Sequence, residues 1–321
     1  MSMEQIIKNS KKRILHLPIN GYGLPSPEQT DKIMQQISQD PLCELIAFDK
    51  SVGPWDQDLE YLSWAEQLNP NRPFFIITSN YYYRENKHKQ IVYYPHWFFT
   101  LLDDKNLKKY SAQDIVDFRP YKICCLNRNP WLHRCLNFLA MRRQPWFDQC
   151  QYSFGVWDRK DFDTSPTMTE QDLAFLRSIN PTRLGIKDDP SFYVSNHSSA
   201  HELCSIDYVT ESRVDNLFVS EKSWKPLFSG QLFFILGPKG LIKHLRDLGV
   251  ETFDDVIDHG YDQETDLETK IQMLMKSISN TIENIDSIWK HTQTGRLKNL
   301  ELVFDRDFHD RLVEDVIKIT S

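Results

Sequence analysis

Gln231-Leu-Phe-Phe-Ile-Leu-Gly-Pro238 contains the most strongly apolar strand that the sequence predicts. An unbroken apolar run closed by a Gly-Pro pair is typical of a strand buried on both faces. Residues 241–248, which follow it, have the apolar spacing of a helix. A buried strand joined directly to a helix is the repeating unit of a parallel α/β sheet.

Similar units precede this strand in the second half of the chain. The apolar and turn patterns predict strands over 121–126, 151–154 and 206–210 and near Phe192, with helices over 131–142 and 170–179. Two long helices are predicted after the strand, over 265–289 and 300–319. These elements indicate a second domain over residues 119–300 and a C-terminal helix over 301–321, which could pack back on the first domain.

The first half of the chain has the same alternation. Strands are predicted over 13–18, 45–48, 73–78 and 91–94, and helices over 27–37 and 59–68. Polar residues dominate from 101 to 120, as expected for a connection between domains. We therefore expect a first domain over residues 1–118 and an α/β fold with doubly wound parallel sheets, whose ligands bind beyond the C-terminal strand ends.

Length and composition limit the class of protein. The chain has 321 residues, enough for two domains, and 38 Lys and Arg against 45 Asp and Glu give a net charge of -7. This balance argues against a sequence-independent nucleic-acid binder. No apolar run is long enough for a transmembrane segment, and the N-terminus lacks the apolar core of a signal peptide. We expect a cytoplasmic protein whose six scattered cysteines form neither disulfides nor a zinc site.

Basic residues follow the first strand of the second half. In Leu126-Asn-Arg-Asn-Pro-Trp-Leu-His-Arg134, a turn places Arg128, His133 and Arg134 around the start of a helix. A helix N-terminus and arginine side chains together favour phosphate binding. The alternative is that both arginines are ordinary surface residues of the helix.

A second polar cluster combines acids and bases between predicted strands. Glu211 and Glu221 can accept hydrogen bonds from sugar or ribose hydroxyls, and Lys222 and Lys225 can neutralise a diphosphate. Such a set suits a nucleotide-sugar. The alternative is helix capping alone, with Ser220 as the N-cap and Glu221 in the first turn.

These two clusters carry a family resemblance over residues 121–262. The chain resembles the fucosyltransferase-like C-terminal domain of GT-B glycosyltransferases, of which the α-1,3-fucosyltransferase family is the best-known member. Asp207-Tyr-Val-Thr-Glu-Ser212 is similar to that family's Phe-Glu-Asn-Ser strand, and Val219-Ser-Glu-Lys-Ser-Trp-Lys-Pro-Leu227 is similar to its Val-Thr-Glu-Lys element. The chain departs from the family at Val209-Thr210-Glu211 and in the extension Trp224-Lys225-Pro226.

The resemblance implies two Rossmann-like domains facing a cleft and transfer of a sugar, with inversion, from a GDP-sugar such as GDP-fucose to a glycan or other hydroxyl acceptor. It implies that Glu221 binds the ribose, that Lys222 binds a phosphate and that Arg134 contacts the diphosphate. With the residues derived above, the expected donor-binding set is Arg128, Arg134, Glu211, Ser220, Glu221, Lys222 and Lys225. No cofactor is expected.

We expect the first half of the chain to bind the acceptor and to supply the base that takes the proton of the acceptor hydroxyl. Asp49, Asp56, Glu85 and His96 all lie in or after predicted strand ends, and we favour Asp56 and His96. The alternative for His96, between Pro95 and Trp97, is a packed and hydrogen-bonded ring.

Two rival functions stay open at this point. Asp161-Phe-Asp163 has the D-x-D form that holds a divalent metal in other transferases, but this short pattern often arises by chance, and cations and a helix end can replace a metal at a leaving diphosphate. We therefore expect no metal. The other rival is a non-catalytic protein on the same fold that binds a nucleotide-sugar or a glycan.

Overall fold

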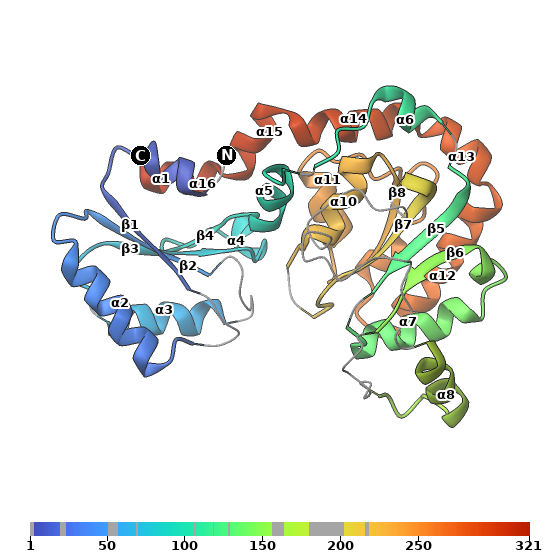
Figure 1. Cartoon of the computed structure of the whole chain (residues 1–321), viewed down its shortest axis with the longest axis horizontal. Coiled ribbons are helices and arrows are strands. Elements are labelled where there is room, and N and C mark those ends of the chain that lie inside the picture. Colours follow the sequence, from blue (N-terminus) through green and yellow to red (C-terminus); the bar gives the residue numbers. More distant parts are fainter. Residues whose placement is uncertain are drawn as a thin grey trace. The chain divides into compact units, whose positions relative to one another are not determined.

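The computed structural model divides the chain into two compact units (Figure 1). The first unit comprises Met1–Asp103, Asn216–Val219 and Phe304–Ser321, and the second comprises Asp104–Asp215 and Ser220–Val303. The structure describes residues 3–19, 24–50, 57–68, 70–105, 107–117, 119–127, 129–155, 164–179, 202–215 and 218–321.

The change of unit at Asp103 lies earlier than the expected boundary at residue 118. The segment after Asp103 contains α6 (Ala112–Val116), and buried side chains of the second unit hold its end. Arg296 Nη1 donates to the Ile115 carbonyl at 2.5 Å, and Trp289 Nε1 donates to the Val116 carbonyl at 3.3 Å. The polar connection thus belongs to the second unit, while the last residues of the chain belong to the first.

The sheet of the first unit has four parallel strands in chain order, namely β1 (Ile14–Pro18), β2 (Leu45–Asp49), β3 (Phe74–Thr78) and β4 (Ile91–Tyr93). α2 (Pro27–Gln39) and α3 (Asp58–Gln67) cover one face of this sheet, as Figure 1 shows. Strands added in one direction by crossovers of the same hand place their helices in this way. The core beneath them includes Phe48 and Tyr61.

Helices from both ends of the chain cover the opposite face of this sheet (Figure 1). α1 (Met3–Lys8) packs against α16 (Glu314–Thr320), and α16 contacts β4. α4 (Tyr82–Glu85), α5 (His96–Leu102) and α15 (Arg306–Leu312) also belong to this unit. Because the strands follow chain order, the described part of this sheet does not reverse direction, so the predicted doubly wound arrangement is absent from it. Alternation of strands and helices cannot predict the order of strands in a sheet.

The sheet of the second unit does reverse. Its four parallel strands lie in the order β6-β5-β7-β8, and their bounds are β5 (Tyr121–Leu126), β6 (Cys150–Ser153), β7 (Cys204–Thr210) and β8 (Leu232–Leu236). Its helices are α7 (Leu132–Arg142), α8 (Glu170–Ile179), α10 (Glu221–Ser229) and α11 (Leu241–Asp247), with short 3-10 turns at Phe147–Gln149 and Gly260–Gln263. The expected α/β class with two parallel sheets is confirmed.

The C-terminal helices differ from the prediction. Instead of continuous helices over 265–289 and 300–319, the chain forms α12 (Leu267–Glu283), α13 (Ile285–His291), α14 (Gln293–Phe304), α15 (Arg306–Leu312) and α16. Asp305 caps α15 by accepting the Asp307 N–H at 3.1 Å, so it ends one helix and begins the next. The prediction of a single helix over 301–321 is therefore wrong. The apolar spacing of a helix continues through this segment, but polar capping residues such as Asp305 break it into shorter helices.

All six cysteines are buried and unbridged, as predicted. Within the described ranges, no helix combines the length and the apolar character needed to cross a bilayer.

Candidate functional site

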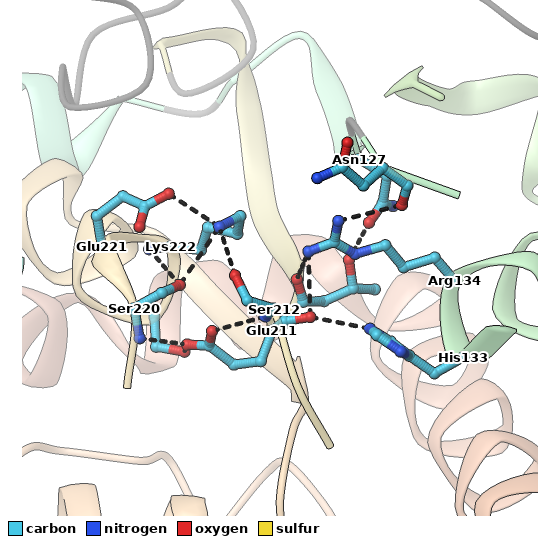
Figure 2. A network of polar contacts seen from close by, with 11 residues as sticks. Asn127, His133, Arg134, Glu211, Ser212, Ser220, Glu221 and Lys222 are labelled. Atoms are coloured by element: carbon cyan, nitrogen blue, oxygen red, sulfur yellow. Dashed lines mark hydrogen bonds and ion pairs between the residues drawn. The ribbon is translucent and has the colours of Figure 1, made fainter. Parts of the chain in front are cut away.

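The strand order of the second unit creates one distinctive place. β5 and β7 are neighbours, yet the chain leaves β5 toward β6 and leaves β7 toward β8. Beyond such a reversal the two following loops diverge, and open α/β sheets bind ligands in the space left there. The labelled residues of the polar network in Figure 2 come from the segments after these two strands, namely Asn127, His133, Arg134, Glu211, Ser212, Ser220, Glu221 and Lys222. These eight residues all belong to the second unit.

The first turn of α7 holds the end of β7 through two buried side chains. Arg134 Nη2 donates to the carbonyls of Glu211 at 3.1 Å and Thr210 at 3.3 Å, and Nη1 donates to the Asn129 carbonyl at 3.2 Å. His133 Nε2 donates to the same Glu211 carbonyl at 2.9 Å. Most of the hydrogen-bonding capacity of Arg134 is thus used by the backbone, although its buried Nε has no partner among the described residues.

Burial changes the proton affinity of both side chains. It lowers the pKa of Arg134 to about 10, against the attraction of Glu211 and Glu221. Burial and the neighbouring charge of Arg134 lower the pKa of His133 to about 4, although its bond to the Glu211 carbonyl favours the charged form. His133 is therefore neutral near pH 7 and carries its proton on Nε2, where it donates.

The loops after β5 and β7 also meet directly. The Thr210 hydroxyl donates to the side-chain oxygen of Asn127, and both residues are almost completely buried. Asn127 Nδ2 donates to Cys125 Sγ at 3.2 Å. This contact fixes the two diverging loops at the point where they separate.

The carboxylate of Glu211 is completely buried and connects β7 to α10. Its Oε1 accepts the Ser220 N–H at 3.0 Å and the Ser223 hydroxyl at 2.5 Å, and its Oε2 accepts the Ser212 N–H at 3.0 Å. A carboxylate satisfied in this way stabilises the loop and the helix start. In this structure its oxygens are engaged by the protein's own donors.

Lys222 is the cation of this network that reaches solvent. Its Nζ lies 2.9 Å from Glu221 Oε1, 3.3 Å from the Ser212 hydroxyl and 3.4 Å from the Ser220 hydroxyl, as Figure 2 shows. Its side chain is 26% exposed, against 11% for Glu221. An amine held by hydroxyls and a carboxylate at the first turn of a helix can exchange these partners for a phosphate.

Ser220 is the N-cap of α10, and its hydroxyl accepts the Lys222 N–H at 3.3 Å. The capping geometry is therefore present, and the carboxylate of Glu221 lies beside a cation as well. Burial acts to raise the pKa of Glu221, but the charges of Lys222 and Lys225 outweigh it and hold the pKa below its ordinary value. Burial lowers the pKa of Lys225 to about 8, against the attraction of Glu221.

The structure brings five of the predicted donor-binding residues into one network, namely Arg134, Glu211, Ser220, Glu221 and Lys222 (Figure 2). Lys225 lies one turn further along α10 and is buried. Arg128 lies outside the described residues. The bound ligand itself remains a prediction.

The predicted bases lie elsewhere. His96 begins α5 in the first unit, with ring contacts to Tyr94 and Trp97, and burial lowers its pKa despite the opposing effect of Asp49. Asp56 lies outside the described residues, as does the Asp161-Phe-Asp163 motif. In the part of the chain that the structure describes, no group of three or more His, Cys, Asp or Glu side chains is arranged to hold a metal ion.

Three hydroxyl residues of the network were not predicted as site residues from the sequence, namely Thr210, Ser212 and Ser223. Their signal was present, because each lies within three residues of a predicted site residue in Asp207–Arg213 or Ser220–Lys225. Hydroxyls near charged groups are too common in sequences to single out without the fold.

No protein-family model matches this chain, and no curated protein matches its sequence.

Proposed function

We propose that this chain is a glycosyltransferase of the GT-B type, which binds the nucleoside diphosphate of a GDP-sugar, with GDP-fucose the first candidate, beyond β5 and β7. The observation that carries the proposal is the position of Lys222. A partly exposed amine, held at the N-terminus of α10 by Ser212, Ser220 and Glu221, faces the strand reversal where α/β sheets bind ligands.

Each member of the network has a role in this proposal. Lys222 and the N-terminal N–H groups of α10 bind the diphosphate and stabilise the charge that grows on it as it leaves. Glu221 accepts hydrogen bonds from the ribose hydroxyls. Arg134 and Glu211 act through the backbone and the helix start, which fits their burial and existing partners.

The reaction is a direct displacement at the anomeric carbon. The acceptor hydroxyl attacks as the bond to the diphosphate breaks, which inverts the configuration, and a general base takes the hydroxyl proton. The cationic side chain and the helix N-terminus supply the electrostatic stabilisation that such a leaving group requires. The acceptor is a glycan or another hydroxyl compound.

The proposal is tested by nucleotide binding and nucleotide release. Thermal unfolding is measured with GDP-, UDP-, CMP- and dTDP-sugars, since a ligand at 100 times its Kd adds about 2.7 kcal/mol of stability. Stabilisation by GDP-sugars alone, with slow release of GDP that persists in a chelator, is the expected result. Stabilisation without any release favours a nucleotide-sugar-binding protein, and no stabilisation by any donor contradicts the proposal.

A further inference from the structure

A pocket of about 560 Å³ is formed entirely by residues of the first unit. It lies between α1 and α15, and its volume is within the range of pockets that hold small molecules. All of the residues that line it are polar or charged, and all of them precede β1 or follow α14. They are Gln5, Lys8, Asn9, Arg306, His309 and Asp310. The pocket is therefore built by helices from the two ends of the chain and not by the loops that follow the strands.

The spacing of these residues explains why both helices present polar side chains here. Residues 5, 8 and 9 and residues 306, 309 and 310 each have the spacing i, i+3, i+4, which places three side chains on one helix face. Asn9 follows α1 directly, and its N–H continues the helical pattern by donating to the Gln5 carbonyl at 3.1 Å. The buried side chains of the two helices stand at other positions, namely Met3, Ile6, Phe308 and Leu312. Each helix thus packs through an apolar face and contributes a polar face to the pocket.

Packing within the unit holds the walls of the pocket in place. His309 is half-buried, and its ring contacts the rings of Phe98 and Phe99 of α5 at centroid distances of 5.5 and 5.9 Å. α1 packs against α16. The pocket is thus formed by the protein's own contacts, as is usual for small-molecule sites.

Two cations of the pocket are not used by the protein itself. Within the residues that the structure describes, neither the Lys8 ammonium nor the Arg306 guanidinium makes a hydrogen bond or an ion pair. By contrast, Lys318 of the same unit is paired with Glu314. Lys8 and Arg306 together give the pocket a positive charge that is available to an anion.

Asp310 supplies a carboxylate to the same pocket. It is half-buried, its Oδ1 is shielded from solvent, and no described residue donates a hydrogen bond to that oxygen. A carboxylate in such a place is best satisfied by hydroxyl or N–H donors. Gln5 and Asn9 add carboxamides, which both donate and accept hydrogen bonds.

We propose that this pocket is a second ligand site of the protein and that its ligand is a phosphorylated sugar. Arg306 and Lys8 bind the phosphate, because a guanidinium matches two phosphate oxygens and an ammonium adds a compact charge. Asp310 and the two carboxamides bind the sugar hydroxyls. Polar lining disfavours lipids and aromatic compounds, which need apolar surface. The inference concerns the first unit alone and does not depend on the glycosyl transfer proposed above.

The test is thermal unfolding with glucose 6-phosphate, mannose 6-phosphate, glucose and inorganic phosphate, followed by calorimetric titration with each phosphate compound. Ionic strength is kept constant, because salt screens exposed charges. The variants are Arg306→Gln, Lys8→Gln and Asp310→Asn. Arg177→Gln is the matched control, because Arg177 is an exposed arginine of the second unit.

We expect a hexose phosphate to bind, inorganic phosphate to bind more weakly and glucose not to bind. Arg306→Gln and Lys8→Gln should each weaken binding about ten- to a hundredfold, whereas Arg177→Gln should match the wild type. Asp310→Asn should lower the preference for hexose phosphate over inorganic phosphate, because it removes an acceptor for hydroxyls and a charge that repels phosphate. Amide hydrogen exchange should slow in α1 and α15 when the hexose phosphate binds.

Three results overturn the inference. Neither hexose phosphate could bind the wild type in the millimolar range, Arg306→Gln and Lys8→Gln could both bind as tightly as Arg177→Gln, or Lys222→Ala could lose the binding that Arg306→Gln keeps, which would place the ligand in the second unit. Because Lys8 and Arg306 are exposed, their variants should fold and keep the stabilisation by GDP-sugars. Failure of this inference therefore leaves the proposed function standing, and failure of donor binding leaves this pocket to be tested by itself.

Discussion

The backbone N–H of Ser220 donates to the buried carboxylate of Glu211 across 3.0 Å, so the residue that follows β7 fixes the N-cap residue of α10. The backbone of Glu211 is held by α7, because its carbonyl accepts hydrogen bonds from Arg134 and His133. Glu211 thus joins the two loops of the candidate site. The position of Lys222 depends on these contacts of Glu211.

Removal of the Glu211 carboxylate should destabilise the protein strongly. In Glu211→Ala the Ser220 N–H and the Ser223 hydroxyl lose a buried acceptor, and each unsatisfied group costs about 1–3 kcal/mol. We expect a loss of at least about 2 kcal/mol in urea unfolding, and a smaller loss in Glu211→Gln, which keeps one acceptor oxygen. The exposed Glu301→Ala should change stability by less than about 0.5 kcal/mol. Equal stability of the two alanine variants would remove Glu211 from this structural role.

His133 should make stability depend on acidic pH. Its pKa is about 4 in the folded protein, against an ordinary value of 6.5, because burial and then Arg134 disfavour the charged ring. The unfolded chain therefore binds more protons between these values, and stability falls as the pH drops from 6.5 to 4. We expect a loss on the order of 3 kcal/mol that His133→Gln, which can still donate to the Glu211 carbonyl, does not show. Parallel stability curves for the two proteins would contradict this assignment.

Gly230 should tolerate a side chain less well than Gly240. Both have positive φ, at 62° and 81°, so alanine strains the backbone in either place. At Gly230 a Cβ would also lie 2.6 Å from the Ile115 side chain, whereas at Gly240 nothing lies within 4 Å. We expect Gly230→Ala to be less stable than Gly240→Ala by about 1–3 kcal/mol in thermal unfolding. A difference near zero would mean that Ile115 moves aside without cost.

Lys222→Ala should lower the affinity for the donor without lowering the thermal stability of the protein. The side chain is partly exposed, and within the described residues its amine contacts Ser212, Ser220 and Glu221. Its removal should therefore leave thermal stability close to that of the exposed control Lys276→Ala. A hydrogen bond to a charged group contributes about 1.5–3 kcal/mol, so donor affinity should fall about ten- to a hundredfold. The measurement is a titration of each variant with GDP-sugar. A variant that unfolds as readily as it loses the donor would count against the binding role.

Much of the fold was predictable from local pattern. The strands at β1, β5 and β8 and the helices α2, α7 and α8 lie where apolar spacing and turn residues indicated. The order of the strands was not predictable, because alternation of strands and helices is the same whether a sheet grows in one direction or reverses. That order decides where the two polar clusters meet.

The candidate site was predictable in composition and less so in roles. Charged residues after strand ends identified Arg134, Glu211 and Lys222, but whether a side chain faces a ligand or its own backbone depends on tertiary contacts.

The most direct test of the central claim is a crystal structure of the protein with GDP. We predict that a phosphate oxygen lies within hydrogen-bond distance, about 3 Å, of Lys222 Nζ at the start of α10, with the ribose beside Glu221. GDP bound in another part of the chain, with Lys222 still held by Ser212, Ser220 and Glu221, would contradict the account.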